Sequence, residues 1–130
     1  MSVGDNIWRV KIYKASRIRQ TEVMADEGRE LRPRERALIA RLLESVQNGQ
    51  DLADTLESSR VREMNDGGMG SLEFVNRSNS RRSATQIAEL QFEDADGVPV
   101  TAALNVDRHG ALFELDLFKG DFSPLISLPE

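Results

Sequence analysis

The chain has 130 residues, a formal net charge of −5 and 39% hydrophobic residues, a composition typical of one soluble globular domain that buries a single core. It contains no cysteine, which excludes disulfides, thiolate metal sites and a cysteine nucleophile. No apolar run approaches the roughly 20 residues that cross a bilayer, and the first residues lack the pattern of a secretory signal, so we expect a cytoplasmic, bacterial-type protein.

Charge is distributed unevenly along the chain. Residues 1–36 hold nine basic against six acidic residues, whereas residues 85–130 hold two against nine. Contacts with nucleic-acid phosphates need Lys and Arg. The acidic half therefore argues against nucleic-acid binding, and it favours a basic partner or simply good solubility.

The first 30 residues form a segment apart from the rest. Trp8, Val10 and Ile12 alternate with two basic residues and a tyrosine, which predicts a short edge strand. The alternation is lost after Ala15, and we interpret residues 16–30 as a linker or loosely held arm. Residues 31–130 are then expected to form a single domain.

Two helices are predicted at the start of this domain. The first begins near Pro33, which suits a first helical turn because its missing N–H costs nothing there, and Asn48-Gly49 would end it. Its apolar residues form one stripe, consisting of Leu38, Ile39, Leu42, Leu43 and Val46. A second, shorter helix is expected from Asp51 to about Glu57.

Residues 61–75 predict a β-hairpin. Two strand-like runs flank Asp66-Gly67-Gly68-Met69-Gly70, which holds three of the nine glycines of the chain. Glycine adopts positive φ without a Cβ clash, and an aspartate side chain accepts hydrogen bonds from the amides that follow it, so this sequence favours a tight reversal. The same amides could form a nest for an anion, but a phosphate loop normally precedes a helix and has a nearby Lys. Because a strand follows here, a structural turn is the better interpretation.

Three further strands are expected after a polar loop at 76–83. They are Thr85–Asp94, Val98–Val106 and Ala111–Phe118, joined by short turns that contain glycine. With the hairpin, they predict an α+β fold with about five antiparallel strands and one or two helices on one face.

Strand alternation predicts an acidic surface on the opposite face of this sheet. The face carries, among others, Glu89, Glu93, Glu114 and Asp116. Like charges that lie opposite one another destabilise a sheet. We therefore interpret the acidic face as a candidate binding surface.

Catalytic and metal sites find little support in the sequence. Asp94-Ala95-Asp96-Gly97 resembles the start of a calcium loop, but the twelfth position is Asn105 and not a bidentate Glu, so a hairpin turn is expected. His109 is the single histidine and lies in a predicted turn, which suits neither a catalytic triad nor a zinc site. Glu114 and Asp116 could form an acid/base pair, but only inside a cleft. We predict no cofactor and no metal.

The C-terminal run is unusually apolar. It contains Phe118, Phe122, Leu125 and Ile126, which are expected to fold back over the core. Alternatively, they form an exposed surface for a second copy of the chain or for a partner.

Four segments together resemble a small bacterial domain family of unknown function. They are Glu63–Leu72, Asp96–Val98, Phe113–Lys119 and Phe122–Leu125. The resemblance spans about residues 31–129 and implies a common fold, but it implies no activity and no catalytic residue. In size, acidity and lack of cysteine, the chain is also similar in character to immunity proteins, which neutralise a toxin by binding it.

The sequence thus leads to the hypothesis of a non-enzymatic protein-binding domain, in its sharpest form an immunity protein or antitoxin against a basic toxin. The expected contact residues are Asp66, Glu89, Glu93, Glu114 and Asp116, whose charge would speed association. The alternative is a small enzyme or ligand-binding domain that uses the Gly-rich hairpin with Asp66, Glu114 and Asp116, and a concave pocket containing these carboxylates would favour it. A homodimer is a third possibility, and neither a membrane nor a nucleic-acid partner is expected.

Overall fold

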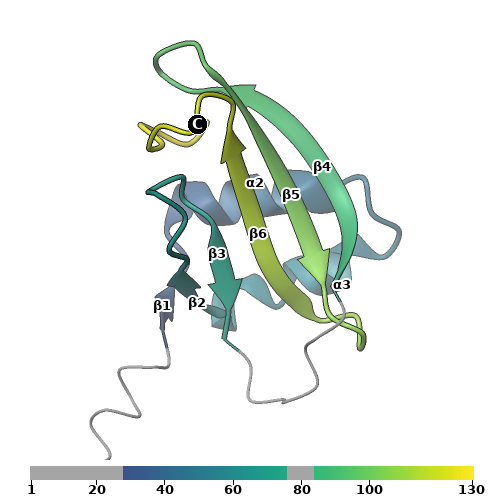
Figure 1. The fold of residues 1–130 in the computed structure, drawn as a ribbon. Coiled ribbons are helices and arrows are strands. Elements are labelled where there is room, and N and C mark those ends of the chain that lie inside the picture. The colour runs from purple at the N-terminus through teal and green to yellow at the C-terminus, as the bar shows by residue number, and fades with distance from the viewer. Residues whose placement is uncertain (1–27, 76–83) are drawn as a thin grey trace, which may run out of the picture.

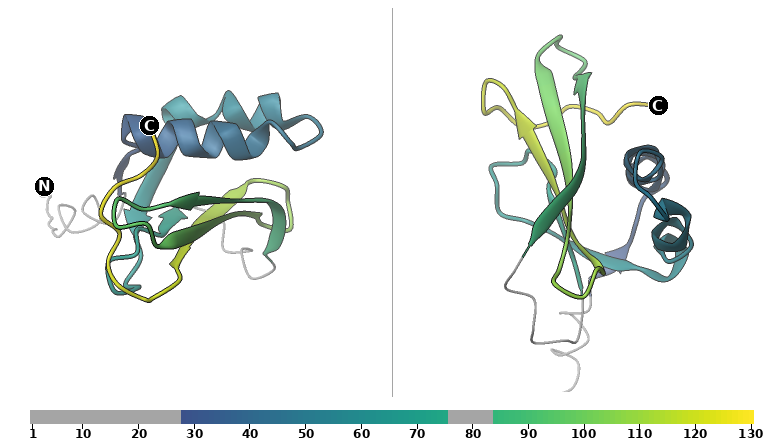
Figure 2. Two further views of the ribbon diagram at one scale, coloured as in Figure 1. Left: turned by 90° about the horizontal axis from the view of Figure 1, so that it is seen from above. Right: turned by 90° about the vertical axis from the view of Figure 1, so that its right-hand side faces the viewer.

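The computed structural model of the protein describes residues 28–75 and 84–130. These residues form two layers, an antiparallel sheet and a pair of helices that cover one of its faces (Figures 1 and 2). The α+β class is therefore as predicted. The strand expected at Trp8–Ile12 and the loop at 76–83 lie outside the described residues.

The helical layer consists of α2 (Pro33–Leu43), α3 (Gly49–Ala53) and a short 3-10 helix (Leu56–Ser58). Pro33 is the first residue of α2, as expected from its missing N–H. The predicted apolar stripe faces the sheet: its four residues within α2 are buried, with Ile39 fully inaccessible, and Val46, which follows the helix, is partly buried. The second predicted helix is two separate short pieces, because α3 ends at Ala53 and the 3-10 turn follows.

Within the described residues, the sheet has six strands in the order β1-β2-β3-β6-β5-β4, all antiparallel. Their bounds are β1 Arg29–Glu30, β2 Arg60–Glu63, β3 Leu72–Phe74, β4 Thr85–Glu93, β5 Pro99–Val106 and β6 Leu112–Lys119. The hairpin (β2 and β3) and the meander (β4 to β6) are as predicted. They join through β6, where Leu115 lies opposite Leu72 of β3.

The prediction of about five strands is one too few. The sixth strand is β1, in which Arg29 lies opposite Val61 of β2. It has only two residues, which is too short to show the alternation by which strands are recognised in a sequence. It comes from the segment assigned above to the N-terminal arm.

The core lies between the two layers. Side chains from both layers are fully buried there, including Ile39, Val61, Leu104 and Leu115. After β6, the chain leaves the end of the sheet and crosses to the helical layer near the start of α2 (Figure 2). No helix among the described residues is long and apolar enough to span a membrane.

Three of the four apolar C-terminal residues are exposed and do not fold back over the core as first expected. Leu125 packs against the core, but Phe118 is 48% exposed and Phe122 is 68% exposed. Their rings stack edge to face with centroids 5.2 Å apart. Ile126 is also exposed, so the C-terminal segment is partly core and partly apolar surface.

Candidate binding surfaces

The face of the sheet that the helices do not cover, turned towards the viewer in Figure 1, carries most of the predicted site residues. Alternation along the strands puts Glu114 and Asp116 on this face, because the intervening Leu115 is buried against the helices. Five carboxylates of β3, β4 and β6 share the face, and we call this set the acidic face: Glu73, Glu89, Glu93, Glu114 and Asp116. The structure therefore brings together four of the five predicted contact residues.

The centre of the acidic face holds like charges side by side. Glu114 of β6 lies directly opposite Glu73 of β3 and opposite Asn105 of β5. Asn105 Nδ2 donates to Glu114 Oε1 (3.3 Å) and to Asp116 Oδ2 (2.9 Å). Burial raises the pKa of Glu114 and repulsion from Asp116 and Glu73 raises it further, against the opposing hydrogen bond from Asn105.

This arrangement predicts that ionisation of Glu114 lowers the stability of the fold. Because its folded-state pKa is raised, its ionisation destabilises the fold as pH rises above the ordinary value of 4.5. Glu114→Gln should therefore match the parent protein near pH 4 and be more stable at pH 7, by about 0.5 kcal/mol. Urea unfolding at both pH values measures the difference. Glu93→Gln, which removes a charge opposite Pro99, is the control, and an equal gain in both variants would contradict the prediction.

Asp66 stands apart from the acidic face, in the loop that joins β2 to β3. Its Oδ1 accepts a hydrogen bond from Met69 N (3.1 Å) and its Oδ2 accepts one from Ser71 N (3.0 Å). Burial alone would raise the pKa of Asp66, but the hydrogen bonds from Ser71 and Met69 outweigh it and lower that pKa. Its carboxylate therefore holds the turn, in which Gly68 and Gly70 adopt φ of 83° and 97°.

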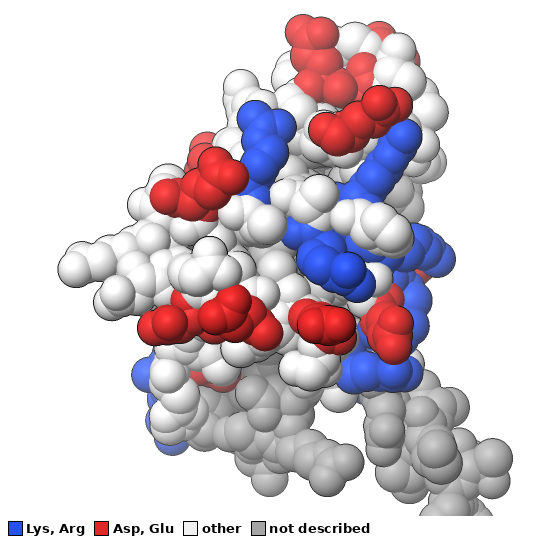
Figure 3. All heavy atoms as spheres, turned by 180° about the vertical axis from the view of Figure 1, so that it is seen from behind, with Lys and Arg blue, Asp and Glu red and all other residues white. Residues whose placement is uncertain are grey.

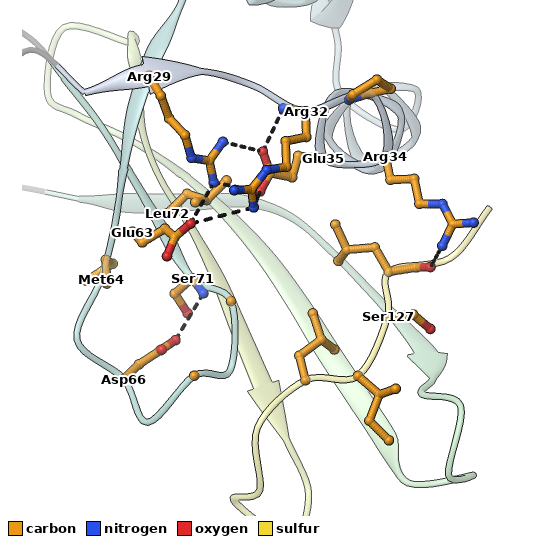
Figure 4. A pocket seen from close by; sticks show the side chains of 16 residues that line it. Arg29, Arg32, Arg34, Glu35, Glu63, Met64, Asp66, Ser71, Leu72 and Ser127 are labelled. Carbon is orange, nitrogen blue, oxygen red and sulfur yellow. Dashed lines mark hydrogen bonds and ion pairs between the residues drawn. The ribbon is translucent and has the colours of Figure 1, made fainter.

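A pocket of about 610 Å³ lies between the start of α2, the β2–β3 loop and the C-terminal segment. Figure 4 shows three arginines on one side, from β1, the residue before α2 and the first turn of α2, and Asp66 and Ser71 from the loop on the other. Of the carboxylates named in the ligand-binding alternative, the pocket contains Asp66 but neither Glu114 nor Asp116. The geometry that would favour that alternative is thus present only in part.

An ion-pair cluster forms one wall of this pocket. Arg29 donates to both carboxylate oxygens of Glu35 at 2.9 Å and to Glu63 at 3.2 Å. Glu35 also accepts a hydrogen bond from Arg32 N (2.8 Å). Burial alone would raise the pKa of Glu35, but Arg29 and Arg32 lower it. Sequence reasoning missed this cluster, although a Glu three residues after the helix cap is a known capping signal.

A second polar cluster lies where the C-terminal segment leaves the sheet; the side chains of Lys119 and Asp94 are fully buried, and that of Asp96 is 35% exposed. Lys119 Nζ donates to Asp94 Oδ2 (2.8 Å), to Asp96 Oδ2 (2.8 Å) and to Pro124 O (3.2 Å). Asp94 also accepts hydrogen bonds from the N–H groups of Ile126 (2.8 Å) and Ser127 (2.9 Å). The two aspartates that resemble a calcium loop are thus in a hairpin turn, where they bind the ammonium of Lys119.

A signal for this cluster exists in the sequence. Lys119 shares strand parity with Leu115 and Leu117, so alternation places it on the core face of β6. A lysine in such a position needs a buried carboxylate partner. Within residues 28–75 and 84–130, no group of three or more His, Asp or Glu is placed to hold a metal ion.

The comparisons with known proteins identify a family but no activity. A domain of unknown function, DUF6984, matches residues 28–129. No curated protein and no solved structure matches the chain. The matched region runs from just before β1 into the C-terminal segment, and so it includes both the acidic face and the pocket. The resemblance to a domain family of unknown function is therefore confirmed, and the chain belongs to the DUF6984 family.

Proposed function

We propose that this domain is a non-enzymatic protein-binding module that engages a basic partner protein through its acidic face. The observation that carries the proposal is the crowding of Glu73, Glu114 and Asp116 on an uncovered sheet surface. The basic residues in the described strands of this face are Arg60 and Arg62, both on β2. Of the three neighbouring strands β4 to β6, β4 and β6 thus present carboxylates, and none of the three has a basic side chain on the same face.

The loss of stability that these neighbouring like charges cause supports a role in binding. Cross-strand like charges destabilise a sheet, and residues that cost stability are retained chiefly where function needs them. A cationic side chain from a partner would remove the repulsion that raises the pKa of Glu114. It would also be attracted over long range before contact, which speeds association.

In its sharpest form, the proposal makes the domain an immunity protein or antitoxin. The partner would be a co-encoded toxin with a basic cleft, and the acidic face would cover that cleft. Asp66 is expected to contribute less than the other four predicted residues, because its carboxylate oxygens already accept hydrogen bonds within the loop.

The test is affinity capture with the full chain as bait, followed by an affinity measurement on the protein that is recovered. The test variant reverses four charges on the acidic face: Glu89→Lys, Glu93→Lys, Glu114→Lys and Asp116→Lys. We expect it to lose the partner, with an affinity reduced by at least about 100-fold. Circular dichroism and the melting temperature report whether the fold is kept.

The chain offers a matched control on the other side of the molecule. Figure 3 shows the helical side, where a row of acidic side chains crosses the surface. Four exposed acidic residues in and around α2, α3 and the 3-10 helix give the same change in net charge: Glu44→Lys, Asp51→Lys, Asp54→Lys and Glu57→Lys. Equal loss of binding in both variants would assign the effect to net charge, and retained binding in both would overturn the proposal.

A further inference from the structure

We propose that the pocket beneath the C-terminal segment binds a small amphipathic anion, with an aliphatic body inside the pocket and a carboxylate head at Arg32 and Arg34, at the start of α2. This function is separate from the protein-binding role of the acidic face. The pocket and the face share no residue, so either proposal stands if the other fails.

The size and the apolar lining of the pocket fit an aliphatic body. Its volume of about 610 Å³ lies within the range of small-molecule sites. Leu72 lines it from β3, and Leu125 and Leu128 line it from the C-terminal segment. Four large hydrophobic residues are exposed in the described part of the chain, and two of them, Met64 and Ile126, lie at this pocket. Exposed apolar groups gathered at a hollow are typical of a binding site.

The acidic groups of the pocket are already engaged. Glu35 accepts both guanidinium hydrogen bonds of Arg29 and one from Arg32 N. Asp66 accepts hydrogen bonds from two amides of its own loop. Glu63 is bonded to Arg29. A cationic ligand would therefore have to displace existing contacts before it could bind these carboxylates.

The arginine side chains at the mouth of the pocket can still bind an anion. The side chain of Arg32 is 64% exposed, and its guanidinium approaches Glu63 at 3.6 Å and Glu35 at 3.9 Å, which are ion-pair distances longer than a hydrogen bond. The side chain of Arg34 is 51% exposed and contacts Leu128 O (3.3 Å) and Glu130 Oε2 (3.2 Å).

The contact between Arg34 and Glu130 places a carboxylate at one of these guanidinium groups. Glu130 belongs to the exposed end of the C-terminal segment, and its carboxylate already reaches this guanidinium. An exposed ion pair of this kind is weak, so a ligand carboxylate can replace it while its aliphatic body displaces water from the leucines. Both parts of an amphipathic anion thus find a complementary surface.

Octanoate is the probe for this proposal, and 1-octanol is the uncharged comparison. Titration followed by amide chemical shifts of the full chain should show saturable octanoate binding, with perturbations at Gly68, Gly70, Ser71 and Ser127, which line the pocket. Octanoate should bind about tenfold more tightly than 1-octanol. Octylammonium should bind more weakly than 1-octanol.

Variants separate the arginine contribution from general hydrophobic binding. Arg32→Gln with Arg34→Gln should reduce octanoate affinity to that of 1-octanol. Arg41→Gln with Arg108→Gln removes two exposed charges that do not line the pocket and should leave octanoate affinity unchanged. The proposal is overturned if octanoate does not saturate, binds no better than 1-octanol, or binds equally to both double variants. The four-residue reversal of the acidic face should not alter octanoate binding.

Discussion

Lys119→Ala is expected to lower the melting temperature by about 10–20 °C and to loosen the C-terminal segment. The side chain of Lys119 is 0% exposed, and its ammonium binds Asp94, Asp96 and a main-chain carbonyl. Removing the cation leaves the carboxylate of Asp94 buried without its charged partner, which is among the costliest changes in a protein interior. Thermal unfolding by circular dichroism measures the fall, and amide hydrogen exchange at Ile126 and Ser127 measures the loosening.

The pH range of this contribution follows from the two pKa shifts. Burial alone would raise the pKa of Asp94, but hydrogen bonds from Lys119 and from the main chain lower it well below its ordinary value of 3.8. Burial alone would lower the pKa of Lys119, but Asp94 and Asp96 raise it above its ordinary value of 10.5. The pair therefore stabilises the fold fully between these ordinary values and is lost as pH falls below the first or rises above the second.

A control variant makes the Lys119 prediction specific. Arg108→Ala removes an exposed cation from the turn between β5 and β6 and should change the melting temperature by no more than about 2 °C. If Lys119→Ala behaved in the same way at pH 7, the buried cluster could not be what anchors the C-terminal segment.

Leu115→Ala is expected to destabilise the fold by about 2–5 kcal/mol. Leu115 is fully buried and lies between Leu72 of β3 and Leu104 of β5, at the point where the hairpin meets the meander. Truncation at this position leaves a cavity that surrounding side chains from two parts of the sheet would have to fill. Urea unfolding at pH 7 measures the loss in the free energy of unfolding.

The same strand provides the comparison. Phe118 is a larger residue of β6 on the opposite face and is 48% exposed. Phe118→Ala should therefore cost well under half as much as Leu115→Ala, on the order of 1 kcal/mol. Equal losses would mean that β6 does not present Leu115 to the core and Phe118 to solvent.

Local sequence patterns were sufficient to predict most of the sheet. The turns at Asp66–Gly70 and Asp94–Gly97 were recognisable because glycine and aspartate have specific roles in a reversal. Alternation then assigned each side chain of β4 to β6 to a face, and this is why Glu114 and Asp116 could be placed together before the structure was known. Their placement with Glu73 needed the pairing of β3 with β6, which no local pattern specifies.

The pocket could not be predicted in the same way. Its lining comes from the start of α2, the β2–β3 loop and the C-terminal segment, which are far apart in the sequence. None of these segments has a binding motif of its own. Asp66 was predicted as a contact residue from its place in a conspicuous loop, yet its neighbours within the loop take up its carboxylate. Which groups donate hydrogen bonds to a side chain depends on the path of the folded chain, and not only on the spacing of residues in the sequence.

The position of β6 also means that the sheet cannot be completed without the last strand in the chain. It is the last strand of the sheet in the chain, yet it lies between β3 and β5 and is paired with both. A polypeptide that stops before Leu112 would leave β3 with an unpaired edge and β5 without one neighbour, and unpaired edges readily recruit other chains. Contacts between distant segments also slow folding. The nascent domain therefore remains open to mispairing until its final strand has been synthesised.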